Sequence, residues 1–159
     1  MAVYLTDPEI EALIAERKLL PDDYWAVLMD GLKREESHRR SSLQVTGERG
    51  NSFLLSIRQA LLNPLNFSVI LALEIPNSND TFILRRCNGS LAHTNRIERN
   101  TITTFHIHMA TERYQQLGAD PEHYAEATDR YTDVGGALMC MIADCNFIPP
   151  ASESTPRLI

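Results

Sequence analysis

Two histidines at alternate positions, His106 and His108, are the residues of this chain best placed to do chemistry. They lie in the segment 105–109, where Phe105, Ile107 and Met109 occupy the other alternate positions. In a β-strand, alternate residues share one face and stand about 6.6 Å apart at the backbone. The apolar residues are expected to face the core, which leaves both imidazoles on the opposite face. Because imidazole titrates near neutral pH, such a pair suits proton transfer or the binding of a shared ligand.

Side chains that bind anions precede this pair in the sequence. Arginine binds phosphate oxygens through forked hydrogen bonds. If the histidine strand pairs with the segment 82–87, an arginine of that segment joins the histidine face. We therefore predict His93, His106 and His108 as catalytic residues. The predicted ligand-binding residues are Arg85, Arg86, Asn95 and Arg96.

Other kinds of site are less well supported by the sequence. His93 or Glu112 would complete a three-ligand metal set with the histidine pair, but nearby arginines repel a cation. We predict no metal and no cofactor. A nucleophile at Cys87 has no local signature, and the chain lacks a P-loop, a G-x-G-x-x-G motif and an H-E-x-x-H motif. The structural alternative is that both histidines are polar residues on a solvated strand face, and that the segment before them is an ordinary polar loop.

Strands and helices with different periodicities must position these residues. Alternating apolar residues predict five strands, over 43–46, 53–58, 67–75, 82–87 and 105–109. Cap residues followed by proline or by apolar residues at helical spacing predict an N-terminal helical hairpin over 7–20 and 22–32, and C-terminal helices over 120–131 and 137–147. Helices that flank a run of strands indicate an α+β fold, with an antiparallel sheet of about five strands.

Composition is typical of an ordinary globular protein. The 159 residues are 43% hydrophobic and 23% charged, which predicts a single α+β domain over 1–148 and a flexible C-terminal tail over 149–159. No apolar run reaches the roughly 18 residues of a membrane span, and no signal-peptide pattern opens the chain. With three cysteines and no C-x-x-C spacing, we predict a cytoplasmic protein without disulfides.

Charge is unevenly distributed along the chain. The net charge is −6, yet residues 33–99 carry ten basic and six acidic residues. An acidic protein is a poor non-specific binder of nucleic acid, but a basic central segment allows a local anion site. The alternative is that the basic segment and the acidic ends only solvate and pair with each other.

One stretch resembles a family of small uncharacterised proteins of bacteria and their phages or prophages. The shared pattern is an arginine-containing strand, then His93-x-Asn95, then His106-x-His108, and it ends at Asp144-Cys145-Asn146-Phe147. The likeness covers residues 50–148 and departs at 96–98, where the family has a Pro-Asp-Gly type of turn. It implies a phage or prophage origin and carries no established activity.

These observations predict a small soluble protein that binds a phosphate-bearing anionic ligand, a nucleotide or RNA, at a His/Arg cluster on a sheet face. If the protein is an enzyme, the predicted reaction is metal-independent phosphodiester cleavage, as in a ribonuclease. One alternative is a non-enzymatic interaction protein that binds a host protein in phage–host conflict. The other is a protein that holds a metal ion through its histidines.

Overall fold

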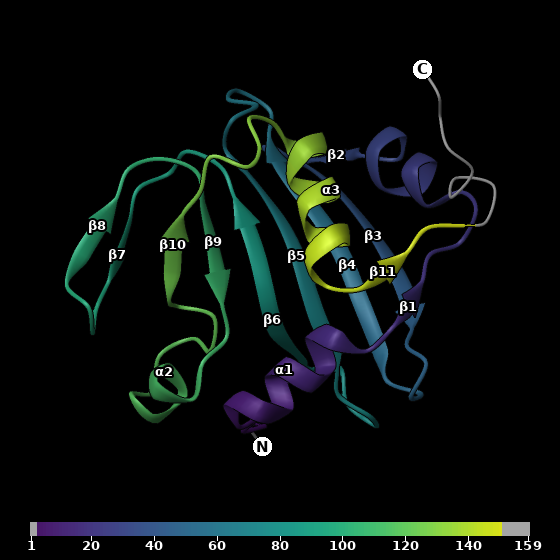
Figure 1. Ribbon diagram of the computed structural model, residues 1–159. Helices are drawn as coiled ribbons and strands as arrows, with labels where there is room; N and C mark the ends of the chain where they lie inside the picture. The colour runs from purple at the N-terminus through teal and green to yellow at the C-terminus, as the bar shows by residue number, and fades with distance from the viewer. Residues whose placement is uncertain (1–2, 151–159) are drawn as a thin grey trace.

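A seven-stranded antiparallel sheet dominates the computed structural model, which describes residues 3–150 (Figure 1). The strand order across the sheet is β10-β9-β6-β5-β4-β3-β2. The strands span Lys33–Glu35 (β2), His38–Thr46 (β3), Ser52–Ala60 (β4), Phe67–Glu74 (β5), Thr81–Asn88 (β6), His106–Met109 (β9) and Ala125–Ala127 (β10). Two smaller pairs complete the strands: β7 (His93–Asn95) with β8 (Asn100–Ile102), and β1 (Lys18–Leu19) parallel to β11 (Phe147–Ile148).

Two of the helices lie on one face of the sheet. Figure 1 shows α3 (Val134–Asp144) and α1 (Asp7–Ala15) in front of the central strands. Asp133 starts α3 by accepting a hydrogen bond from the Gly136 N–H at 2.7 Å, and Thr6 and Glu9 form a capping box at the start of α1. The remaining helical segments are short: the π-helical η1 (Ala26–Asp30) and α2 (Glu112–Gln116).

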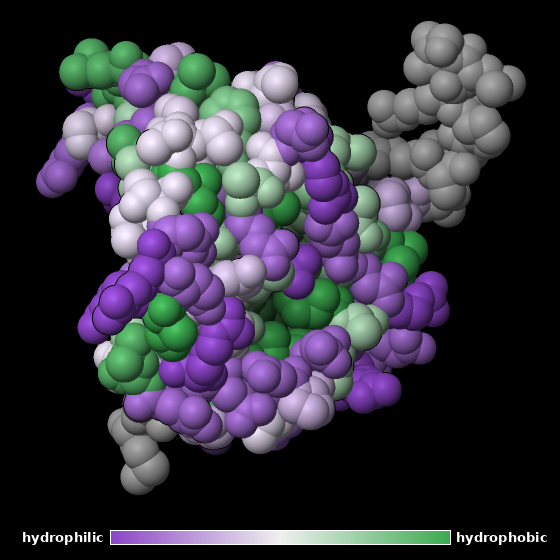
Figure 2. Space-filling view, turned by 60° about the vertical axis from the view of Figure 1, so that its left-hand side comes forward, coloured by the Kyte–Doolittle hydropathy of each residue, from purple (hydrophilic) through white to green (hydrophobic). Residues whose placement is uncertain are grey.

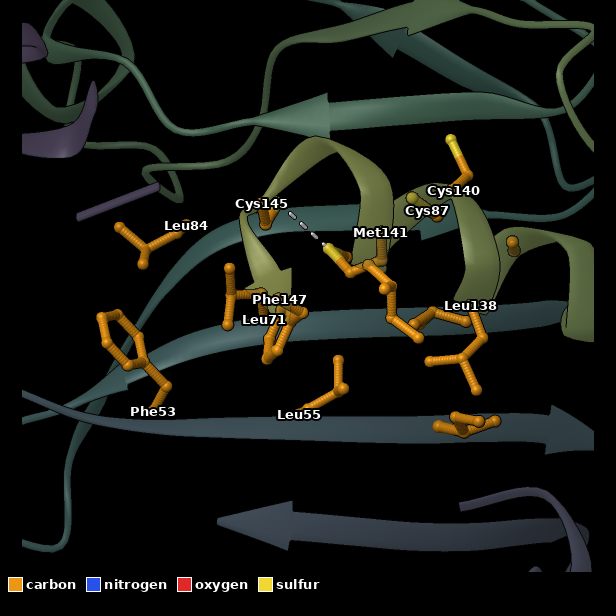
Figure 3. Packing of buried hydrophobic residues seen from close by; sticks show 14 of the residues in the cluster. Phe53, Leu55, Leu71, Leu84, Cys87, Leu138, Cys140, Met141, Cys145 and Phe147 are labelled. Carbon is orange, nitrogen blue, oxygen red and sulfur yellow. Dashed lines mark hydrogen bonds between the residues drawn. The ribbon is translucent and has the colours of Figure 1, made fainter. Parts of the chain in front are cut away.

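The core fills the space between the sheet and these helices. Inward residues of β4 and β5 alternate with accessible ones, as the period of a half-buried strand requires. Figure 3 shows Leu71 and Leu55 of the sheet packed beneath Leu138 and Met141 of α3. The predicted stripe in the strand 67–75 is confirmed, since Phe67, Val69, Leu71 and Leu73 are buried and Ile75 packs against the same core.

The structure confirms the predicted α+β class and antiparallel sheet, but it differs from the prediction in the number of strands and in the helices. The main sheet has seven strands and not about five, because the polar segment 33–40 adds β2 and lengthens β3, and residues 125–127 add β10 beside β9. The prediction of an N-terminal helical hairpin is wrong for its second helix, since the segment 22–32 forms only the short η1. Of the two predicted C-terminal helices only α3 forms, because 120–131 instead makes a turn and strand β10.

The surface on the β7–β8 side is mainly hydrophilic. Figure 2 brings this side forward and shows hydrophobic residues at the bottom of a hollow. No helix within residues 3–150 is long and apolar enough to cross a membrane. The predicted tail lies, from residue 151 onward, outside the described residues.

Candidate functional site

Strand register brings the predicted histidines next to an arginine. β9 pairs with β6, so that His108 lies opposite Arg86 and His106 lies opposite Asn88. Directly opposed residues of an antiparallel pair share one face of the sheet. Ile107 faces the helix-covered core, while both histidines lie on the other face, where His106 is 1% exposed and His108 6% exposed. The two imidazoles are thus buried in a polar cluster and are not solvated on an open strand.

The β7–β8 hairpin covers this cluster and adds His93 to it. The ring centroid of His93 lies 4.5 Å from that of His108 and 5.8 Å from that of His106, with the His93 and His106 rings nearly parallel at 18°. Asn95 anchors the hairpin, because its amide exchanges hydrogen bonds with the backbone N–H and carbonyl of Ala125 at 2.9 and 2.8 Å. Asn95 therefore acts through His93, whose Nε2 lies 3.1 Å from the Asn95 Oδ1.

Two site residues were missed at the sequence level. His123, which the pattern Asp120-Pro121-Glu122 places at a helix start, lies with its ring centroid 4.8 Å from that of His93. Glu122 is 4% exposed and pairs with Arg86. Both residues reach the site because the segment after α2 turns back to form β10 beside the histidine strand. Only the density of titratable residues in 120–123 hinted at a site there.

Hydrogen bonds fix the protonation of the strand histidines. The Nδ1 of His106 faces the Thr104 carbonyl at 2.8 Å, and the Nδ1 of His108 faces the Glu122 carbonyl at 2.9 Å. Because a carbonyl oxygen only accepts, each Nδ1 carries the proton. The neutral ring then has its lone pair on Nε2, which is the nitrogen available to accept a proton from a ligand.

Burial disfavours the charged form of these imidazoles. It lowers the pKa of His108 to about 3 and also lowers the pKa of His106, and the nearby charges of His93 and Arg86 act in the same direction. Burial lowers the pKa of His93 as well. Hydrogen bonds that His93 donates to Asn95 and to the backbone of His123 oppose that effect, since they favour the charged form of His93. Of the three rings, His93 has the most groups that support a proton on both nitrogens.

Arg86 is the arginine that belongs to this cluster. Its Nη2 donates to the buried Oε2 of Glu122, which leaves other guanidinium donors for a ligand. Burial raises the pKa of Glu122, and the charge of Arg86 counteracts this rise.

The structure does not bring Arg85 or Arg96 to the cluster. A bulge where Leu71 and Ala72 pair with β6 turns Arg85 toward the helix-covered face, where its guanidinium lies 3.9 Å from Asp144. Arg96 is exposed just after β7. Neither residue lines the pocket described next.

The histidines line an open pocket of about 280 Å³. That volume admits a phosphate group with part of a sugar, and is at the small end for binding sites of whole ligands. Arg86 and Glu122 also border a second hollow of about 560 Å³. We call the 280 Å³ pocket the His pocket, because four histidines line it: His93, His106, His108 and His123.

Metal ligation was the alternative use of these histidines. Within residues 3–150, no three His, Cys, Asp or Glu side chains are placed to hold a metal ion together. The presence of Arg86 on the same face adds a positive charge beside His108. This positive charge disfavours a cation in the pocket.

Comparisons with protein-family models, with curated proteins and with solved structures found no match. The resemblance to phage and prophage proteins stays a prediction. The function is therefore argued from the site alone.

Proposed function

We propose that the His pocket binds a phosphodiester and cleaves it without a metal ion, by acid–base catalysis on RNA. The observation that carries this proposal is the convergence of His93, His106 and Arg86 in one open pocket, where the Nδ1 contact of His106 leaves its Nε2 free to accept a proton. Two proton-transfer groups and one cation are the parts that metal-independent phosphodiester cleavage requires.

Each residue has a defined role in this reaction. The Nε2 of His106 takes the proton from the ribose 2′-hydroxyl, whose oxygen then attacks phosphorus. The bond from phosphorus to the 5′-oxygen breaks, and protonated His93 gives a proton to that oxygen. Arg86 stabilises the charge that develops on the non-bridging phosphate oxygens. The products are a 2′,3′-cyclic phosphate and a free 5′-hydroxyl, so no water or co-reactant is consumed.

Substrate binding and protonation of the acid are coupled in this proposal. Burial and the neighbouring charge of Arg86 lower the pKa values of His106 and His93. A bound phosphate supplies negative charge, which raises the pKa of neighbouring imidazoles. Binding of the substrate therefore charges the acid that the reaction needs.

The proposal is tested by incubating the protein with a short single-stranded RNA in the presence of EDTA. We expect cleavage to fragments that end in a 2′,3′-cyclic phosphate, and no cleavage of the same RNA with 2′-O-methyl groups throughout. Cleavage that disappears with EDTA and returns with zinc or manganese would favour the metal alternative. If the RNA stays intact in every condition, the enzymatic proposal is wrong.

A further inference from the structure

A row of polar and basic side chains crosses the uncovered face of the sheet and ends at the His pocket. The pairing registers place one residue from each of six neighbouring strands directly opposite the next. Residues paired in this way share a face, here the face opposite α1 and α3 (Figure 1). The row, hereafter the basic row, consists of Lys33, Arg40, Arg58, Ser68, Asn88 and His106.

Positive charge at the outer end of the row is not neutralised by ion pairs. Lys33, Arg40 and Arg58 are all exposed. None of the five ion pairs within residues 3–150 includes any of the three. Arg40 and Arg58 share this face with His38, and burial together with the charges of the two arginines lowers the pKa of His38. A surface of unpaired basic side chains attracts anions.

The length of the row sets the size of that anion. With strands about 4.8 Å apart, five steps from His106 to Lys33 cover about 24 Å. A nucleic-acid strand at duplex spacing carries one phosphate per about 3.4 Å, so about seven phosphates span this distance. A mononucleotide in the His pocket does not reach Arg40, whereas a polynucleotide contacts both ends of the row.

The chemistry of the row indicates how the polymer is held. Its hydroxyl, amide and basic groups bind phosphate and sugar, and Ser68 is already oriented by a 2.8 Å hydrogen bond to Asn88. Apart from His106 at its inner end, the row contains no aromatic side chain for bases to stack on. Recognition by these residues is therefore of the backbone and is independent of base sequence.

We infer that the basic row is a binding track for single-stranded RNA, which lies across β2 to β6 and presents one phosphodiester to the His pocket. This inference rests on the proposed function, because it names the substrate of the same site as a polymer. It adds a surface, formed by Lys33, Arg40 and Arg58, whose contribution is purely to binding.

The test is the affinity for a fluorescein-labelled, fully 2′-O-methylated 12-nucleotide RNA, measured by anisotropy between 50 and 300 mM salt. The double variant Arg40→Gln/Arg58→Gln is expected to weaken binding about tenfold or more at low salt. It is also expected to reduce the slope of log K against log salt by about 1.4, since each lost phosphate contact of a single strand removes about 0.7. The matched control is Arg34→Gln/Arg39→Gln, which removes the same charge from a directly opposed pair on the other face of β2 and β3.

The outcomes separate this inference from the proposed function. Cleavage of a dinucleotide, which in the His pocket is too short to reach Arg40 or Arg58, is expected to be unchanged in Arg40→Gln/Arg58→Gln. If both double variants weaken binding of the 12-nucleotide RNA equally, or if neither does, the inference of a binding track is overturned even if the dinucleotide is cleaved. If Arg40 and Arg58 are required for binding to vesicles that contain phosphatidylserine, but are not required for binding to RNA, the RNA assignment is also overturned. Failure of wild-type protein to cleave any RNA, with the track intact by anisotropy, overturns only the catalytic proposal.

Discussion

Replacing His106 with alanine is expected to lower the rate of RNA cleavage by about 10²–10⁴-fold, the usual contribution of a general base. The variant loses the Nε2 that accepts the 2′-hydroxyl proton, while His93 and Arg86 remain in the pocket. Because the base must be neutral and the acid His93 must be protonated, the wild-type rate should follow a bell-shaped pH profile, and burial of His106 should place its acidic limb below the ordinary histidine value of about 6.5. Cleavage rates measured from pH 4.5 to 8 check both expectations.

His106 is 1% exposed, so the alanine variant also risks instability. His106→Gln preserves most of the volume, and its unfolding midpoint separates lost stability from lost catalysis. His38→Ala is the matched control, since His38 lies on the same face of the sheet, in β3 and away from the pocket. A folded His106→Gln protein that cleaves RNA at the wild-type rate would show that His106 is not the base.

Replacing Lys18 with methionine is expected to cost about 3–5 kcal/mol of unfolding free energy, because it leaves several buried carbonyl oxygens without a donor, each at a cost of about 1–3 kcal/mol. Lys18 is 0% exposed, and its Nζ donates to the carbonyls of Leu13, Ile14, Glu16 and Cys145 at 2.7–2.9 Å. These carbonyls end α1 and α3, so the ammonium satisfies acceptors that the helices leave unpaired.

Methionine fills the space of the lysine stem next to Phe53 but leaves those acceptors buried without a donor. Urea unfolding at pH 7 measures the loss. Lys33→Met, at an exposed position on β2, is the control and is expected to change the free energy by less than about 0.5 kcal/mol. A loss below 1 kcal/mol for Lys18→Met would mean that the ammonium does not hold the two helix ends.

The central strands were predictable because burial on one side imposes a period of two on β4, β5 and β6. The strand β2 and the start of β3 were not predictable in the same way. Their residues, Lys33 to Arg40, are mostly exposed on both faces near the edge of the sheet, so no apolar alternation marks them. Pairing of β3 with β4, and of β2 with β3, makes this segment extended through backbone hydrogen bonds that a local pattern does not reveal.

The sequence predicted only part of the site, because the rest depends on how distant segments pair. Strand alternation correctly places His106 and His108 on one face, but the choice between Arg85 and Arg86 depends on a bulge in the pairing of β5 with β6. That bulge reverses which side chain faces the core. His123 depends on a contact between segments far apart in the chain, because β10 covers the outer edge of β9.

The most direct test of the His pocket is calorimetric titration of a 2′-deoxy dinucleotide, which binds without being cleaved. Titrations at pH 6 and pH 8, each in two buffers of different ionisation enthalpy, give the affinity and the number of protons exchanged. Burial lowers the pKa of His93 and of His106, so an anion that raises these pKa values draws protons into the pocket. We expect one site per chain, net proton uptake at pH 6, and weaker binding at pH 8, all lost in His93→Gln/His106→Gln. Absence of binding, or binding of Zn²⁺ with proton release at the same histidines, would contradict this account.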